Sequence, residues 1–331
     1  MNKPRFDQTI RAIDLFCGAG GSSWGATQAG VELVAAFDLW ELAGKNHHVN
    51  FPNTRFYHGR LEDIDINQIA KDLGPINLIL ASPECTNHSP AKGSKPRCEE
   101  SKNTAFQVCR FAKVLKPRWI VIENVVNMRR WSRYQEFKME LESHGYHLHE
   151  QVLDSADFGV PQSRRRLFLL CDREQVPAQT SALTLNKRNA QSIVDLNGNY
   201  GWSPLITDRR ATATLERAKR GINAVGPDKP FLLVYYGSDQ AGGWQELSRP
   251  LRTITTVDRF ALVKPSPQGH LMRMLQAPEL QLAMGMDGMR FDHGNRRERI
   301  RMIGNAVCPP VMCAVINGLF QQSAEEDVSH G

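Results

Sequence analysis

The stretch Asn77-Leu-Ile-Leu-Ala-Ser-Pro-Glu-Cys85 contains a short apolar run that ends just before a cysteine. A continuous apolar run of this length is typical of a strand that is buried on both faces of an α/β sheet. Ligands and catalytic groups in such sheets lie just beyond the carboxyl ends of the strands. Cys85 is therefore a candidate reactive thiol, although a lone cysteine is more often a small buried hydrophobic residue.

Strand and helix patterns alternate on both sides of this stretch. The repeated βα units predict an α/β fold with a parallel, doubly wound sheet. After Cys171 the alternation ends, and two later apolar runs predict strands of a second, smaller domain. The runs that predict strands are 13–16, 33–37, 55–57, 77–81, 119–123, 146–153 and 166–171 in the first part, and 231–236 and 253–256 in the second.

Length and composition are those of a globular protein of two domains, with 331 residues and a net charge of +6. The seven cysteines contain no C-x-x-C pair, so we expect reduced thiols in a cytoplasm and no metal site. We expect no membrane segment, because no signal peptide and no apolar run long enough to cross a bilayer is evident. Clusters of arginine favour a phosphate-binding surface over a merely solvated face.

Two other strand ends carry groups suited to a nucleoside cofactor. The turn Phe16-Cys-Gly-Ala-Gly-Gly21 allows the backbone to approach a ligand closely, and a plain tight turn is the alternative. Ser23 stands where the dinucleotide fingerprint has its third glycine. Asp38 ends the second strand, where a carboxylate can accept hydrogen bonds from ribose hydroxyls. Trp40 would either cover an adenine ring or pack against the protein.

Charged residues stand at two further strand positions. Glu123 ends an apolar strand, and burial would raise its pKa and make it a proton donor near neutral pH. Arg164 and Arg166 fall on one face of the strand that follows Gln162, with Arg165 on the other face. These arginines would bind a base carbonyl, a phosphate or Glu123 itself.

The order of these motifs resembles that of the DNA cytosine-5 methyltransferases. The resemblance extends from Arg11 to Leu319 and includes nearly the whole chain. The motifs that carry it are Phe16-x-Gly-x-Gly-Gly21, Pro83-Glu-Cys85, Glu123-Asn-Val125, Gln162-x-Arg164-x-Arg166, Arg252-Thr-Ile-Thr-Thr256 and Gly304-Asn-Ala-Val307.

The resemblance implies S-adenosylmethionine as cofactor and double-stranded DNA as substrate. Cys85 would add to carbon 6 of a flipped-out cytosine, so that carbon 5 can take the methyl group, while Glu123 holds the exocyclic amine and ring nitrogen 3. Arg166 would bind the base carbonyl, and Arg164 would support the loop that carries Cys85. The implied cofactor residues are Phe16, Gly18, Gly20, Gly21, Asp38, Trp40, Asp63, Pro83 and Asn305.

The implied architecture has three parts. Residues 1–171 would form the catalytic and cofactor-binding domain, and residues 172–295 a target-recognition domain whose arginines (Arg209, Arg210, Arg217 and Arg220) read the sequence. Residues 296–331 would pack back on the first domain. We expect a monomer that acts on the nucleoid in the cytoplasm, as part of a restriction-modification system.

The chain departs from the family pattern at two places. Pro-Glu-Cys replaces the commoner Pro-Pro-Cys-Gln, and Thr86 stands where the glutamine would be, which leaves room for a transferred group larger than methyl. The common Gly-Asp-Ile reads Gly59-Arg-Leu61, so Asp63 from the next turn is the substitute for the adenine contact. Two alternatives remain open: an RNA cytosine-5 methyltransferase, and a non-catalytic DNA-binding protein on the same fold.

Overall fold

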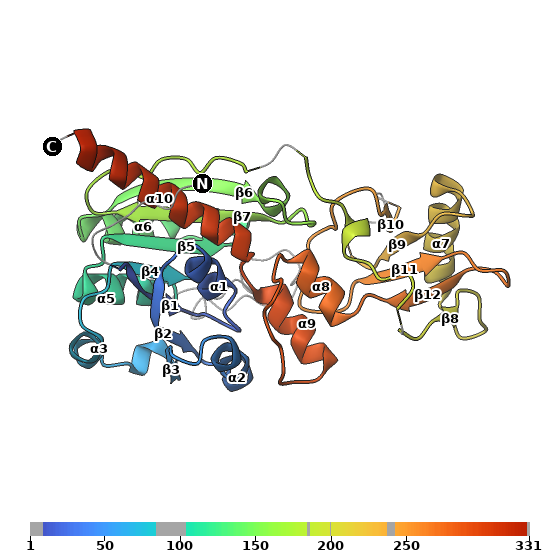
Figure 1. Cartoon of the computed structure of the whole chain (residues 1–331), viewed down its shortest axis with the longest axis horizontal. Coiled ribbons are helices and arrows are strands. Elements are labelled where there is room, and N and C mark those ends of the chain that lie inside the picture. Colours follow the sequence, from blue (N-terminus) through green and yellow to red (C-terminus); the bar gives the residue numbers. More distant parts are fainter. Residues whose placement is uncertain (1–8, 84–103, 184–185, 199, 237–241, 330–331) are drawn as a thin grey trace.

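The computed structural model describes residues 9–83, 104–183, 186–198, 200–236 and 242–329. Figure 1 shows a large sheet covered by helices and, beside it, a smaller sheet with one helix packed on it. Helices α8 and α9 lie between the two sheets, and the long C-terminal helix returns across the large sheet.

The large sheet confirms the predicted α/β fold. In the described part of the chain it has seven strands in the order β3-β2-β1-β4-β5-β7-β6. The first five run parallel, whereas β7 is antiparallel to both β5 and β6. The expectation of a wholly parallel sheet is therefore wrong for β7, which follows β6 without a crossover helix and runs against the other six strands. The strands are β1 (Arg11–Leu15), β2 (Glu32–Asp38), β3 (Arg55–His58), β4 (Leu78–Ala81), β5 (Trp119–Asn124), β6 (His147–Asp154) and β7 (Arg165–Asp172).

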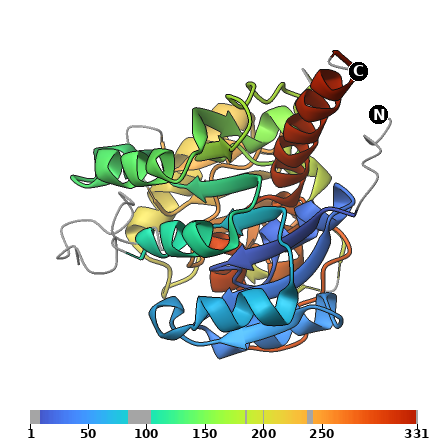
Figure 2. The same ribbon diagram turned by 90° about the vertical axis from the view of Figure 1, so that its left-hand side faces the viewer.

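Side chains alternate between the two faces of this sheet, and each face has its own apolar core. Ala12 of β1 belongs to the core that α1, α2 and α10 cover. Ile13 and Leu15 of the same strand point to the other face and belong to the core under α3, α5 and α6. The view in Figure 2, from the end of the large sheet, shows this layering. The helices are α1 (Gly21–Gln28), α2 (Glu41–Asn50), α3 (Ile66–Leu73), α5 (Phe106–Leu115), α6 (Tyr134–Ser143) and α10 (Pro309–Ser329).

Local capping chemistry defines the starts of α3 and α9. The Asp65 carboxylate accepts hydrogen bonds from the backbone N–H groups of Asn67 and Gln68 at the start of α3. Asn295 and Glu298 form a reciprocal capping box at the start of α9 (Arg296–Asn305). These side chains satisfy N–H groups that have no partner within the helix.

Ser22 does not cap α1, although its position before an apolar pattern suggests it. The helix begins at Gly21, after Gly20 in the left-handed conformation. The hydroxyls of Ser22 and Ser23 instead donate to Oδ2 of the buried Asp14, at 2.5 and 2.6 Å. Burial raises the pKa of Asp14 to about 7.

The smaller sheet has the order β10-β9-β11-β12-β8 among the described residues. Helix α7 (Thr212–Val225) packs on it, and a Cβ on Gly221 would lie only 2.3 Å from the ring of Phe231. The predicted strand 231–236 corresponds to β9, but 253–256 is irregular chain rather than a strand. The strands are β8 (Ser203–Pro204), β9 (Phe231–Val234), β10 (Trp244–Glu246), β11 (Phe260–Lys264) and β12 (Leu271–Met274).

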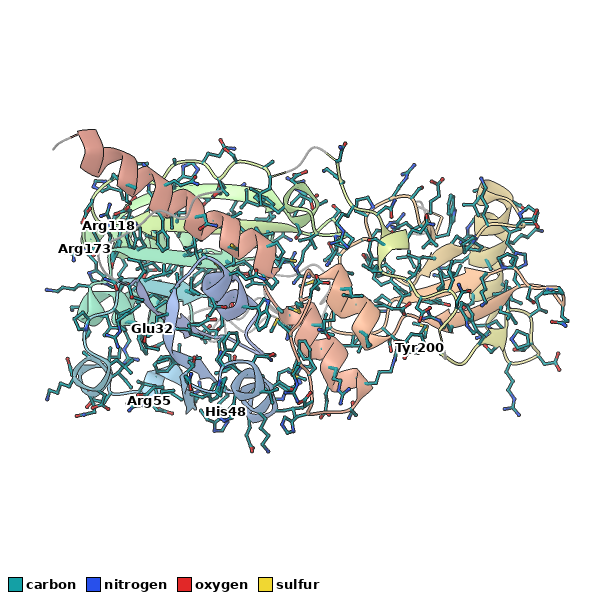
Figure 3. The ribbon with its side chains drawn as sticks, in the orientation of Figure 1. Glu32, His48, Arg55, Arg118, Arg173 and Tyr200 are labelled. Atoms are coloured by element: carbon teal, nitrogen blue, oxygen red, sulfur yellow. The ribbon has the colours of Figure 1, made fainter. Side chains whose placement is uncertain are left out.

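The stretch that follows β7 stays with the first domain. Thr180 exchanges hydrogen bonds with Gln151 of β6, and the backbone N–H of Ala178 donates to Gln322 of α10. These contacts hold the stretch after residue 172 against the large sheet, and Lys187 forms an ion pair with Asp157 at 2.7 Å. Figure 3 shows Arg173 beside Arg118 at the end of the large sheet away from the second domain, in which Tyr200 lies.

The C-terminal part packs back on the first domain through α10 and α1. A Cβ on Gly25 would lie 2.5 Å from the carbonyl oxygen of Pro309, so glycine lets the two helices approach. The helical stretch Arg296–Ala324 is long and apolar enough to cross a membrane, contrary to the expectation from the sequence, but 67% of its most apolar window is buried inside the protein, as in a core helix. The remaining short elements are α8 (Ala277–Ala283) and the 3-10 helices η1 (Leu61–Asp63), η3 (Val126–Arg130), η4 (Ser155–Phe158) and η5 (Ala190–Ser192).

Candidate active site

A cavity of about 660 Å³ opens at the carboxyl ends of β1, β2, β3, β4 and β5, against the end of α9. This size falls within the usual range of ligand sites. Of the residues proposed from the sequence, seven line it: Phe16, Gly18, Asp38, Trp40, Pro83, Glu123 and Asn305. Cys85 and Thr86 lie outside the described residues.

The turn after β1 contains three residues with positive φ, of which Gly20 packs against Phe51. Gly18 has φ of 54°, and Phe16, which is not a glycine, has φ of 59°. A non-glycine residue in this region costs about 1–3 kcal/mol and is found mostly at functional sites. The strained backbone of Phe16 therefore marks the turn as part of the site.

Asp38 ties this turn to the end of β2. Its Oδ2 accepts a hydrogen bond from the backbone N–H of Gly18 at 2.8 Å, and its Oδ1 accepts one from that of Trp40 at 2.7 Å. A carboxylate has about four acceptor positions, so Asp38 can also accept from a ribose hydroxyl. Burial raises its pKa, and the two backbone N–H groups oppose that shift.

Two glycines that were assigned to the cofactor do not line the cavity. A Cβ on Gly20 would meet the ring of Phe51 at 2.6 Å, and a Cβ on Gly21 would meet the carbonyl oxygen of Val307 at 2.4 Å. Their role is close packing, and Gly21 allows the segment after α9 to lie against the start of α1.

Asp63 is likewise absent from the cavity lining. The turn after β3 contributes Arg60, Leu61 and Glu62 instead, while Asp63 is exposed at the end of η1. Glu62 is the acidic residue of this turn that lines the cavity, and the assignment of Asp63 to the adenine contact stays a prediction.

Glu123 and Arg166 form an ion pair beside the cavity. Arg166 Nε lies 3.2 Å from Glu123 Oε1, and both side chains are largely shielded from solvent. Burial raises the pKa of Glu123, and the charges of Arg166 and Arg164 partly oppose this shift. The direction agrees with the role of proton donor expected from the sequence.

Arg164 is buried and holds two distant segments together. Its guanidinium donates to the carbonyl oxygens of Ile254 at 3.0 Å, Gly304 at 2.9 Å and Ala306 at 3.2 Å. The expected support of the loop that carries Cys85 concerns residues beyond the described part. In the described part, Arg164 binds the C-terminal end of α9, where Asn305 lines the cavity.

Two positioning residues were not singled out from the sequence. Asn124 at the end of β5 donates from Nδ2 to the carbonyl oxygen of Pro83 at 3.1 Å. Gln162 accepts from the backbone N–H of Ile254 at 2.8 Å and donates to the carbonyl oxygen of Ala283 at 3.0 Å. Both stand in motifs quoted above, and both are buried amides, which need partners.

A second pair that the sequence analysis missed lies in the other domain. Arg273 and Glu279 form a bidentate ion pair at 2.6 and 2.7 Å, with both side chains nearly inaccessible to solvent. The Arg273 guanidinium also stacks near the rings of Tyr200 and Trp202. The sequence does carry a signal for this pair, because Arg273 stands inside the apolar run 271–275. A buried arginine without an ionic partner there would destabilise the fold, so a carboxylate partner is expected.

Three of the four arginines expected to read DNA have partners within the domain. Arg210 donates to the carbonyl oxygens of Leu205 and Pro204. Arg220 donates to that of Gly242, and the Arg217 guanidinium lies 5.7 Å from the centroid of Tyr235. Their assignment to sequence readout stays a prediction. Arg209 is exposed.

Comparison with known proteins identifies the family. The family model described as C-5 cytosine-specific DNA methylase matches residues 10–321. The type II methyltransferase M.HindV of Haemophilus influenzae is 32% identical over 90% of this chain and 92% of its own length. M.HgiDI of Herpetosiphon aurantiacus is 30% identical over 74% of this chain and 80% of its own length.

Solved structures agree in fold. A putative DNA modification methyltransferase encoded within a prophage (E. coli) superposes with a TM-score of 0.70 and 18% identity, over 95% of this chain and 99% of that one. The Entamoeba histolytica methyltransferase EhMeth gives 0.69 and 18%, over 96% and 99%. The chain therefore belongs to the C-5 cytosine-specific DNA methylase family, and is an S-adenosylmethionine-dependent DNA cytosine-5 methyltransferase.

Proposed function

We propose that the cavity at the strand ends is where the cofactor and the target cytosine meet. The observation that carries this proposal is that Glu123, buried and with a raised pKa, lines the same cavity as the Phe16–Gly18 turn and Pro83. Pro83 stands two residues before Cys85 in the sequence. One cavity thus brings together the proton donor, the turn assigned to the cofactor and the approach to the nucleophile.

The residues of the cavity fit S-adenosylmethionine. Asp38 would accept from the ribose, and the flat side chains of Phe16 and Trp40 would contact the adenine, while Asn305 would face the amino-acid end. When bound, the cofactor supplies an activated methyl group on a sulfonium. The chain's own part is to hold these groups in place and to exclude water from them.

Cys85 would attack carbon 6 of the cytosine, which breaks the aromaticity and makes carbon 5 nucleophilic. Glu123 would hold the exocyclic amine and donate a proton to ring nitrogen 3, which neutralises charge that develops on the ring. Arg166 would bind the base carbonyl while its Nε keeps Glu123 in position. The target base must leave the duplex stack for this, at a cost of roughly a few kcal/mol.

Cys85→Ser and Glu123→Gln test this assignment, with Cys313→Ser as the matched control at a partly buried thiol. Bisulfite sequencing of DNA from expressing cells should show methylation for the unaltered protein and the control, but none for Cys85→Ser. Glu123→Gln should lower the rate by ~10²–10⁴, which is the usual range for loss of general acid–base catalysis. Duplex containing 5-fluorocytosine should trap a covalent complex unless Cys85 is replaced. Normal methylation by Cys85→Ser would refute the mechanism.

We also propose that sequence choice resides in the second domain, whose sheet and α7 span residues 203–274. Guanine contacts in the major groove usually come from arginine, and Arg209 is exposed on this domain. Exchange of residues 203–274 with those of a relative should move the methylated site. An unchanged methylation pattern would place recognition elsewhere.

The biological setting completes the proposal. The relatives M.HindV and M.HgiDI are named type II methyltransferases, which supports a role in restriction-modification. We propose a cytoplasmic monomer that acts on the nucleoid. Within the described residues no group of three metal-ligating side chains occurs. The family match favours DNA over RNA as substrate.

A further inference from the structure

Arg301 and Trp40 meet at the rim of the cavity although they lie far apart in the sequence. The guanidinium carbon of Arg301 is 4.5 Å from the centroid of the Trp40 ring, and both residues line the cavity. Trp40 is itself held by the hydrogen bond from its backbone N–H to Asp38. A stacked guanidinium uses its face for the ring, so its N–H donors remain directed outward in its plane.

The charges around the cavity distinguish Arg301 from the other cation there. Arg60 lies 3.9 Å from the carboxylate of Glu62, at the rim formed after β3. No carboxylate of the described residues lies within ion-pair distance of Arg301. Arg301 is thus an exposed positive group that lies against the Trp40 ring beside a ligand cavity and pairs with no carboxylate in the described part of the chain.

Asn305 lies one helical turn after Arg301 on α9 and lines the same cavity. Residues four apart share one face of a helix, so the amide and the guanidinium form one edge of hydrogen-bond donors. Arginine binds carboxylates through two parallel N–H groups. S-adenosylmethionine carries a single carboxylate, on its amino-acid end.

We propose that Arg301 binds the cofactor carboxylate and thereby selects amino-acid-bearing cofactors over simpler adenosine thioethers. The inference rests on the placement of the cofactor proposed above. Trp40 acts as the support that orients the guanidinium, and Asn305 contributes the neighbouring donor.

The test removes the Arg301 charge and the ligand carboxylate separately and together, and compares the losses in binding. Calorimetric titration gives the Kd of S-adenosylhomocysteine and of its decarboxylated form, 5′-S-(3-aminopropyl)-5′-thioadenosine, for the intact protein and for Arg301→Gln. We expect Arg301→Gln to weaken S-adenosylhomocysteine about tenfold, as is reasonable for a charge-assisted hydrogen bond near solvent. The decarboxylated ligand should bind both proteins equally, and Arg301→Lys should recover part of the difference. Arg297→Gln, at an exposed position one helical turn earlier that does not line the cavity, is the control.

Two outcomes would overturn the inference. If Arg301→Gln weakens both ligands equally, then Arg301 only supports Trp40. If it weakens neither, Arg301 does not contact the ligand. Asp38→Ala tests separately whether the cofactor binds in this cavity. It should weaken the binding of both ligands if they bind there, and of neither if they bind elsewhere.

Discussion

The side-chain amide of Asn124 donates a hydrogen bond to the carbonyl oxygen of Pro83 at 3.1 Å. This contact joins the end of β5, where Glu123 stands, to the end of β4, two residues before Cys85. One buried hydrogen bond therefore links the strand end that carries the proposed proton donor to Pro83, which precedes the proposed nucleophile in the sequence. The same side chain accepts from the backbone N–H of Val125 through Oδ1.

Asn124→Asp should lower kcat by roughly 10–100-fold, since loss of a buried hydrogen bond costs about 1–3 kcal/mol. Aspartate keeps the acceptor for Val125 but places an oxygen against the carbonyl of Pro83. The affinity for S-adenosylmethionine should change much less than kcat, because this contact orients the reacting side chains. Steady-state kinetics and cofactor titration measure the two effects, with Asn127→Asp as control. An unchanged kcat would show that the contact is dispensable.

Arg166→Gln should move the basic limb of the pH–rate profile to higher pH. Arg166 lowers the pKa of Glu123 while burial raises it, so removal of the arginine leaves the effect of burial less opposed. Glu123 then keeps its proton to higher pH. The maximal rate should also fall, but the position of the limb is the decisive measurement. Arg165→Gln, at an exposed neighbouring position, should leave the limb in place. If the basic limb of the pH–rate profile does not move in Arg166→Gln, a group other than Glu123 determines it.

Gly304→Ala should destabilise the fold by about 1–3 kcal/mol, the usual cost of forcing atoms into a packed site. The added Cβ would lie 2.2 Å from the carbonyl oxygen of Thr255, a backbone atom that cannot turn aside. Chemical denaturation measures the loss in free energy of unfolding. Gly201→Ala is the control, because no atom lies within 4 Å of its Cβ position. Equal stability of the two variants would contradict the close packing of α9 on residue 255.

Asp14→Asn should remove a pH dependence of stability. Burial raises the pKa of Asp14 from 3.8 to about 7, so the folded state binds this proton more tightly than the unfolded state does. The stability that Asp14 contributes is present below about pH 4 and is lost as the pH rises to about 7; one pKa unit corresponds to about 1.4 kcal/mol.

The free energy of unfolding of the unaltered protein minus that of Asp14→Asn should thus fall by a few kcal/mol between pH 4 and 7. The nearby His47 has its pKa lowered to about 3 by burial, and its contribution has the opposite slope. Because His47 is present in both proteins, it cancels in the difference. A difference that stays flat with pH would mean that Asp14 is ionised throughout.

The sequence by itself determined the α/β class, the strands that end in functional groups and the chemistry those groups can perform. Apolar runs and turn residues are local features of the sequence, so the ends of β1, β2, β4 and β5 can be predicted from them. The parallel order of strands follows from the intervening helices. The raised pKa of Glu123 also follows, because a carboxyl at the end of an apolar strand is buried.

Only the tertiary structure decided which distant residues meet. The reversal of β7 depends on a direct connection from β6 that no local pattern specifies. Gly21 packs against the backbone of Val307, and Arg164 binds three carbonyl groups of two segments that are distant in the sequence. The stacking of Arg301 on Trp40 has the same origin. Such contacts arise when segments far apart in the chain fold against each other, and the local composition of neither segment encodes the partner.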